Sequence, residues 1–325
     1  RFAFSEPREL VLKGKDDRVT AWLALARRKA ALSFGGPFIG RDAALERLTE
    51  DYVKRMRGAA GGFYLTGDAG IGKTRLASEF WARLKAFPNF SATFLAIDPA
   101  RFCADEYAAL RYAVLDFLDE AAEPPEGEFV AMARDRLSLD PERARVAYRL
   151  FRPAAERGDP AVFREALADL FDAILASDGD LYPDVILVDN ASAMDGASRS
   201  FCRAWLARPR TRPFVVLCDR REDPEIAAIF GVDERLALGP LADEDAARLA
   251  RALEPEGLDE RAVSLVVERS QGYPLFVEEY VKLLHRDREA LAVPDSISAT
   301  ILAQVDRLDV EARSLLRKEI GRAHV

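Results

Sequence analysis

The chain has 325 residues, of which 49% are hydrophobic and 31% are charged. This composition excludes an intrinsically disordered chain, and the length allows about two domains with cores of their own. The formal net charge is −8 and no dense cluster of Lys and Arg stands out, which argues against a broad nucleic-acid-binding surface.

The cysteines and histidines form no recognisable metal or disulfide pattern. Cys103, Cys202 and Cys218 are far apart and lack C-x-x-C spacing, so the sequence indicates neither a disulfide framework nor a zinc site. His285 and His324 are interpreted as surface residues. No apolar run is long enough to cross a bilayer and no secretory signal opens the chain, so we expect no membrane partner and a cytoplasmic location.

Residues 9–25 contain two strand-like runs joined by a charged turn with Gly14, which predicts a β-hairpin. The L-K-G-K-D-x-x-V form of this segment resembles the terminal strands of class III nucleotide cyclase domains. The resemblance implies an upstream cyclase domain in the same polypeptide, of which residues 1–30 are the end. Its catalytic residues would lie before Arg1, so we expect no cyclase chemistry here. A plain edge hairpin is the alternative.

A new unit begins after a linker at residues 31–37. Phe38-Ile39-Gly40-Arg41 leads into an amphipathic helical pattern that runs to Leu48, with Gly40 as the turn.

The strongest motif is a complete G-x-x-x-x-G-K-T sequence between a strand-like run (62–66) and a helix-like run (75–81). Its glycines allow backbone N–H groups to surround phosphates, and the following helix adds the positive end of its dipole. We expect Lys73 to reach the β- and γ-phosphates and Thr74 to ligate Mg²⁺. The remaining residues of this loop are Gly67, Asp68, Ala69, Gly70, Ile71 and Gly72. The motif therefore predicts a site for a nucleoside triphosphate.

These two segments, F-I-G-R-D followed by G-D-A-G-I-G-K-T-R-L, resemble the AAA-type ATPase module of STAND signal-transduction ATPases. The resemblance implies ATP or ADP as the nucleotide, a parallel α/β P-loop core over residues 38–237 and a helical lid over residues 238–290. It also implies that Gly40 and Arg41 frame the adenine pocket and that Arg75 belongs to the nucleotide-binding loop. A solvated charge is the alternative for Arg41.

Further along the chain, residues 92–97 read as a strand, and residues 107–118 and 161–176 as helices that cover the sheet. Residues 184–189 form an apolar run that ends in Asp189, the pattern of a strand whose carboxylate holds the Mg²⁺ hydration shell.

The residue after this carboxylate is Asn190, where the family commonly has a second acid. An amide lacks the basicity to deprotonate the attacking water, and the loss of a general base typically slows a reaction by roughly 10²- to 10⁴-fold. We therefore expect slow or absent hydrolysis. Asp195 is the alternative base if the loop folds back.

The strand-like run at residues 213–218 leads to Arg221, which the resemblance assigns to sensing the γ-phosphate. The alternative is a solvated pair of arginines, Arg220 and Arg221.

From residue 238 the pattern becomes helical. Gly272 and Pro274 resemble the G-x-P motif of the STAND lid, which implies that Pro274 approaches the adenine; a simple turn between helices is the alternative. Residues 291–318 resemble the start of a winged-helix domain, with repeat domains expected downstream. Residues 319–325 resemble a translated sequencing adapter; an ordinary frayed C-terminus is the alternative.

The interpretation is an ATP-binding regulatory switch in a multidomain signalling protein, in which Mg·ATP or Mg·ADP influences an attached cyclase or effector. One alternative is an active AAA-type ATPase that remodels protein or nucleic acid. Another is a degenerate scaffold that binds no nucleotide.

Overall fold

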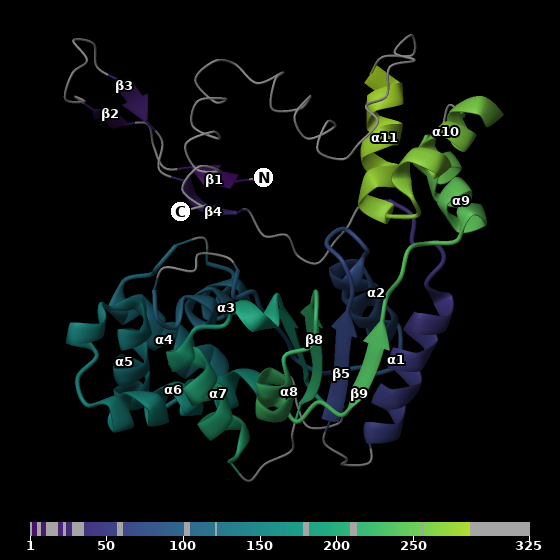
Figure 1. The fold of residues 1–325 in the computed structure, drawn as a ribbon. Coiled ribbons are helices and arrows are strands. Elements are labelled where there is room, and N and C mark those ends of the chain that lie inside the picture. Colours follow the sequence, from purple (N-terminus) through teal and green to yellow (C-terminus); the bar gives the residue numbers. More distant parts are fainter. Residues whose placement is uncertain are drawn as a thin grey trace. The chain divides into compact units, whose positions relative to one another are not determined.

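The computed structural model describes residues 2–4, 8–10, 19–21, 24–27, 36–56, 61–100, 105–120, 122–177, 182–208, 213–254 and 257–286 (Figure 1). The chain forms two compact units. The core unit comprises the described residues within 1–34, 43–68 and 73–238, and the helical unit comprises those within 35–42, 69–72 and 239–325.

The core unit is built on a parallel sheet of five strands in the order β6-β7-β8-β5-β9. The strands are β5 (Gly61–Thr66), β6 (Phe94–Ile97), β7 (Val185–Asp189), β8 (Phe214–Asp219) and β9 (Glu234–Ala237). The central strand β8 is buried along its whole length, as its uninterrupted apolar sequence requires. The predicted parallel α/β fold is confirmed.

Strand register brings the carboxyl ends of the strands to one edge of the sheet. Thr66 of β5 lies opposite Asp219 of β8, and Asp189 of β7 lies opposite Cys218. In open parallel sheets this edge is where ligands bind. It is therefore the edge on which the polar residues of a site can meet.

Helices cover both faces of the sheet. On one face, Tyr52 of α1 (Asp42–Arg55) and Phe80 of α2 (Lys73–Lys85) meet the ring of Phe214 at 5.4 and 5.6 Å between centroids. On the other, Phe201 and Trp205 of α7 (Gly196–Leu206) stack at 5.9 Å. α3 (Ala108–Leu118), α6 (Pro160–Leu175) and α8 (Pro224–Phe230) contribute buried residues to this second face (Figure 1).

Between β6 and β7 the chain adds α4 (Glu126–Leu137), α5 (Pro141–Tyr148) and short 3₁₀ turns at Arg149–Phe151 and Ala154–Glu156. Three helices of the core unit begin with the same Asp-Pro pair. Asp140, Asp159 and Asp223 cap α5, α6 and α8, and each accepts hydrogen bonds from two backbone N–H groups of the first turn. Proline fits the next position because its missing N–H would have no partner there.

Several boundaries differ from the prediction, and three of the differences are informative. β6 begins at Phe94, two residues later than expected, because the backbone N–H of Thr93 donates to the Asp184 carboxylate. α3 begins at Ala108 because Tyr107 has a left-handed φ of 63°. α6 is displaced by one residue from the expected 161–176.

The helical unit contains α9 (Asp243–Leu253), α10 (Glu260–Ser270) and α11 (Pro274–Arg286). Its core consists of Leu241, Ala246, Leu249, Ala250, Val266, Val277, Tyr280 and Val281, with Ile39 packed against them. Helices therefore form in the region expected to be the lid, while its domain boundaries stay a prediction.

Near the N-terminus, β2 (Arg8–Leu10) pairs antiparallel with β3 (Val19–Ala21), and β1 (Phe2–Phe4) pairs antiparallel with β4 (Ala24–Arg27). The pairing of β2 with β3 agrees with the expected hairpin. Its assignment to a cyclase domain stays a prediction, and the expected winged-helix start (291–318) and adapter tail (319–325) lie outside the described residues. No helix in the described part of the chain is long and apolar enough to cross a membrane.

Candidate nucleotide-binding site

The glycine-rich loop joins β5 to α2 at the carboxyl edge of the sheet. Its three glycines all have positive φ angles, 147° at Gly67, 79° at Gly70 and 99° at Gly72. Side chains with a Cβ rarely adopt these conformations, so the loop path requires glycine at these positions.

Lys73 is the first residue of α2. Its Nζ donates hydrogen bonds to the carbonyl oxygens of Gly67 at 2.7 Å and Asp68 at 3.0 Å. The ammonium is therefore held at the loop, where a phosphate group would need its charge.

The two residues expected to bind Mg²⁺ lie side by side. Thr74 Oγ1 donates to Asp189 Oδ2 at 2.7 Å. Burial raises the pKa of the Asp189 carboxyl, the Thr74 hydrogen bond lowers it, and the nearby Asp98 raises it again. A hydroxyl and a carboxylate at this separation suit Mg²⁺, which prefers oxygen ligands and keeps several waters.

Among the described residues no three His, Cys, Asp or Glu side chains gather into a metal site of their own. A P-loop magnesium ion needs fewer protein ligands because substrate phosphates and water complete its octahedron. The pair of Thr74 and Asp189 therefore fits the expected ion.

Asn190 follows β7 with a left-handed backbone (φ 59°, ψ 49°) that asparagine tolerates better than most residues. Its Nδ2 donates to Asp98 Oδ1 at 3.3 Å. Asp98 is the first residue after β6 and belongs to none of the sequence motifs described above. The available signal was its position directly after a strand, at the edge where Asp189 also ends its strand.

A second missed carboxylate is Asp219, the last residue of β8. It is 8% exposed and accepts hydrogen bonds from the backbone N–H groups of Ser192 at 2.6 Å and Arg220 at 2.8 Å. Through Ser192 it fixes the segment that follows Asn190.

Asp195, the alternative base, caps α7 instead. Its Oδ1 accepts from the Ser198 N–H at 2.9 Å and its Oδ2 from the Ser198 hydroxyl at 2.6 Å. Both oxygens therefore serve the helix cap, which leaves this alternative without structural support. Arg221 is exposed on the bend after β8, and its contact with a γ-phosphate stays a prediction.

Arg75 forms an ion pair with Glu79 one turn along α2, at 2.6 Å. The pair lies along the helix, with the Arg75 side chain 20% exposed. A contact between Arg75 and the nucleotide stays a prediction.

The predicted site residues Gly40, Arg41 and Pro274 belong to the helical unit. Arg41 Nη2 donates to the carbonyl oxygens of Ile71 at 3.3 Å and Gly239 at 2.5 Å. Burial lowers the pKa of the Arg41 guanidinium and Asp245 raises it. The carboxylate of Asp245 also lies against Gly40, where an added Cβ would be 2.8 Å from the carboxyl carbon. Arg41 therefore ties the loop tip to the segment that enters α9.

The loop tip also meets the start of α11. The Leu275 backbone N–H donates to the Gly70 carbonyl oxygen at 3.3 Å. A Cβ on Gly70 would lie 3.0 Å from Leu275 Cβ, and one on Gly72 would lie 4.0 Å from Pro274 Cγ. Pro274 and the tip of the phosphate loop are thus neighbours within one compact unit.

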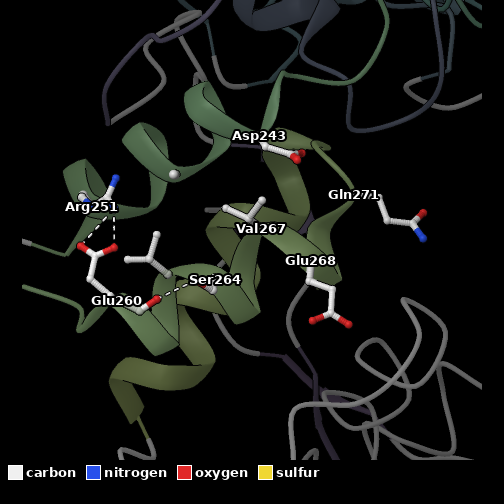
Figure 2. A pocket seen from close by; sticks show the side chains of 9 residues that line it. Asp243, Arg251, Glu260, Ser264, Val267, Glu268 and Gln271 are labelled. Carbon is white, nitrogen blue, oxygen red and sulfur yellow. Dashed lines mark hydrogen bonds and ion pairs between the residues drawn. The ribbon is translucent and has the colours of Figure 1, made fainter.

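The helical unit has a separate open groove between α9 and α10. Arg251 pairs there with both carboxylate oxygens of Glu260, and Ser264 donates to the Glu260 carbonyl oxygen (Figure 2). The groove contains none of the nucleotide-binding residues expected from the sequence, so it is distinct from the candidate site.

The glycine-rich loop joins β5 of a parallel sheet to α2, and its threonine bonds the carboxylate at the end of β7. Together these features define a P-loop NTPase. The sequence profile of the AAA ATPase domain matches residues 37–217, which is more than half of the chain. The protein belongs to the AAA ATPase domain family.

The chain is also similar to solved structures, all at low sequence identity. The Holliday junction branch migration motor RuvB of Thermotoga maritima has 15% identity and a TM-score of 0.45, over 87% of this chain and 74% of RuvB. A Walker-type ATPase of Pyrococcus abyssi has 14% identity and a TM-score of 0.48, over 90% and 79%. Domain III of the Thermotoga maritima replication initiation protein DnaA has 16% identity and a TM-score of 0.45, over 86% and 95%. No curated protein matches the sequence significantly.

Proposed function

We propose that the chain binds Mg·ATP or Mg·ADP at residues 67–74 and uses the bound nucleotide to set the state of its helical unit. The observation that carries this proposal is the pair of hydrogen bonds from Leu275 N–H to Gly70 and from Arg41 to Ile71. Both acceptors are backbone carbonyls at the tip of the phosphate loop. A nucleotide that reshapes this tip changes the hydrogen bonding of α11 directly.

Different residues of the chain would bind the phosphates, the Mg²⁺ ion and the base. The loop amides and the Lys73 ammonium hold phosphate oxygens, while Thr74 and Asp189 hold Mg²⁺. The ion neutralises phosphate charge when it is bound. Gly40, Arg41 and Pro274 lie close to the loop tip and are the candidates for the side of the site that holds the base.

The signalling context is part of the proposal and rests on the resemblance to STAND ATPases. An upstream cyclase domain in the same polypeptide would be the controlled effector, with winged-helix and repeat domains downstream and the cytoplasm as the location. For the nucleotide to control such an effector, its ATP and ADP states must differ in free energy between two arrangements of the protein.

Hydrogen exchange tests the switch. We expect amides at the start of α11, including that of Leu275, to exchange at different rates with ATP and with ADP, each with Mg²⁺. The amides of α5, in the inserted helices of the core unit, serve as an internal control and should not change. Equal exchange along α11 in the two nucleotide states would contradict the switch.

An ATPase that completes repeated turnovers is the second candidate. The observation that favours it is the carboxylate of Asp98 beside Asn190, because it returns a base to a site that the sequence predicts to lack one.

A further inference from the structure

We propose that Asp98 is the carboxylate that activates the attacking water in this site, that Asn190 positions it, and that the chain therefore hydrolyses ATP. This inference rests on the proposed nucleotide binding at residues 67–74. It replaces the expectation of slow or absent hydrolysis, which rested only on the residues directly after Asp189.

Strand pairing places Asp98 at the level of the expected Mg²⁺ ligand. β6 pairs with β7, and their last registered pair is Ile97 with Val188. The next residues are Asp98, directly after β6, and Asp189, the last residue of β7, so the two carboxylates lie at the same edge of neighbouring strands.

The hydrogen bonds of Asp98 leave one oxygen available. Oδ1 accepts both the Ala100 backbone N–H at 3.1 Å and the Asn190 side-chain amide at 3.3 Å. Oδ2 receives no hydrogen bond from any residue that the structure describes. The first oxygen therefore fixes the group, and the second can accept a proton.

Three carboxylates that follow or end β7 and β8 have other roles. Asp189 bonds Thr74 and belongs to the expected Mg²⁺ site. Asp219 accepts two backbone N–H groups, one on each oxygen, and Asp195 caps α7 with both of its oxygens. Asp98, in contrast to these three carboxylates, combines a fixed position with an open oxygen.

The residue directly after β6 is an acid, Asp98, and the residue directly after β7 is an amide, Asn190. The amide of Asn190 cannot serve as the base, yet its N–H can hold the carboxylate and its oxygen can accept a hydrogen bond from water. Asn190 keeps its left-handed backbone at little cost, and aspartate shares this tolerance. The pair can therefore be exchanged by mutation without a change of backbone.

In the reaction, Asp98 Oδ2 accepts a proton from water as the water oxygen bonds to the γ-phosphorus. The bond between that phosphorus and the β–γ bridging oxygen breaks, and its electron pair stays with ADP. The products are ADP and phosphate, and Asp98 then returns its proton to solvent.

The test compares the 325-residue chain with Asp98→Asn, Asn190→Ala, the exchanged double variant Asp98→Asn/Asn190→Asp, and Asp195→Asn as the matched control. ATP affinity is measured by calorimetry, phosphate release in steady state, and the nucleotide retained on each protein by chromatography. We expect Asp98→Asn to bind ATP within about threefold of the parent, to release phosphate roughly 10²- to 10⁴-fold more slowly, and to retain ATP where the parent retains ADP.

Asn190→Ala is expected to lower kcat about tenfold with little change in KM, as loss of a positioning residue should. The double variant should release phosphate at least about tenfold faster than Asp98→Asn, because it restores one acid and one amide to the pair. Asp195→Asn should turn over like the parent, since asparagine also caps helices.

The outcomes separate the two proposals. A parent chain that binds no ATP contradicts the nucleotide-binding proposal and this inference with it. A parent that binds ATP yet releases no phosphate, or an Asp98→Asn variant as fast as the parent, overturns only the role of Asp98. If Asp98→Asn does not fold, an unchanged kcat in Asn190→Ala overturns that role instead.

Discussion

Thr74 Oγ1 donates a hydrogen bond to Asp189 Oδ2 across 2.7 Å and so joins the first turn of α2 to the end of β7. The two groups come from positions 115 residues apart in the chain. Their contact means that the hydroxyl and carboxylate are placed by the fold before any ion arrives. Such preorganisation lowers the cost of binding Mg²⁺.

Thr74→Val tests this placement because it keeps the shape of the side chain and removes the hydroxyl. We expect the gain in ATP affinity produced by Mg²⁺ over EDTA to fall by about 10- to 100-fold. Thr74→Ser keeps the hydroxyl and should retain the gain. An unchanged response to Mg²⁺ in Thr74→Val would show that the threonine does not serve the ion.

Gly70→Ala tests the contact between the loop tip and α11. Its φ of 79° is strained for alanine, and the new Cβ would lie 3.0 Å from Leu275 Cβ. The left-handed conformation alone costs about 1–2 kcal/mol, so the loop of Gly70→Ala should relax away from this path. Because ATP binding must then restore the path, we expect up to roughly tenfold weaker ATP binding by calorimetry. Gly127→Ala in α4 is the control, because nothing lies within 4 Å of its added Cβ. Equal affinities of the two variants would contradict the assigned loop geometry.

Arg55 is a stability determinant of the core unit. Its side chain is 10% exposed and pairs with Asp51 at 2.6 Å and Asp233 at 2.9 Å. Removing it leaves two carboxylates without their cation, so Arg55→Ala should lower the free energy of unfolding by about 2–4 kcal/mol. Arg47→Ala breaks an exposed pair with Glu234 and should cost less than about 1 kcal/mol. Urea unfolding at neutral pH distinguishes these values.

The same pair predicts a pH dependence. Burial by itself raises the pKa of Asp233, but hydrogen bonds from Arg55 and the Gly62 N–H outweigh it and lower the pKa. A lowered folded-state pKa stabilises the fold fully above the unfolded value of about 3.9, and this stabilisation is lost as pH falls through the folded-state value. As the pH falls from about 6 to about 3, the free energy of unfolding measured with urea should decrease more for the parent than for Arg55→Ala. Parallel curves would contradict it.

Phe214 anchors the sheet between α1 and α2. Its ring is 1% exposed and meets Tyr52 and Phe80 at right-angled and tilted orientations. Phe214→Ala should lower the free energy of unfolding by about 3–5 kcal/mol through lost burial and a cavity. Val53→Ala on α1, 45% exposed, should change it by less than about 0.5 kcal/mol. Similar losses in both variants would exclude Phe214 as a core residue.

Local patterns are sufficient to predict the fold class. The apolar runs that end at Thr66, Asp189 and Asp219 form parallel strands, because strands buried on both faces need uninterrupted apolar sequences. The helical spacing of apolar residues predicts Tyr107 inside a helix, but its left-handed backbone is not encoded in that spacing.

The sequence predicts the site residues that belong to one local motif and misses those whose role depends on which strands are neighbours. Lys73 and Thr74 follow from the glycine-rich loop, since their roles depend on neighbours in sequence. Asp98 and Asp219 depend on which strand lies beside which, a long-range property that no local pattern contains. The neighbours of Pro274 at the loop tip become visible only with the structure.

Calorimetric titration of Mg·ATP into the chain, into Lys73→Ala and into the control Lys85→Ala is the decisive test of nucleotide binding at residues 67–74. Lys85 is an exposed lysine of the same helix. We predict that the parent and Lys85→Ala bind ATP equally and that Lys73→Ala binds at least about 100-fold more weakly, since it loses the ammonium that meets the phosphates. Absence of binding by the parent, or equal binding by Lys73→Ala, would contradict the account.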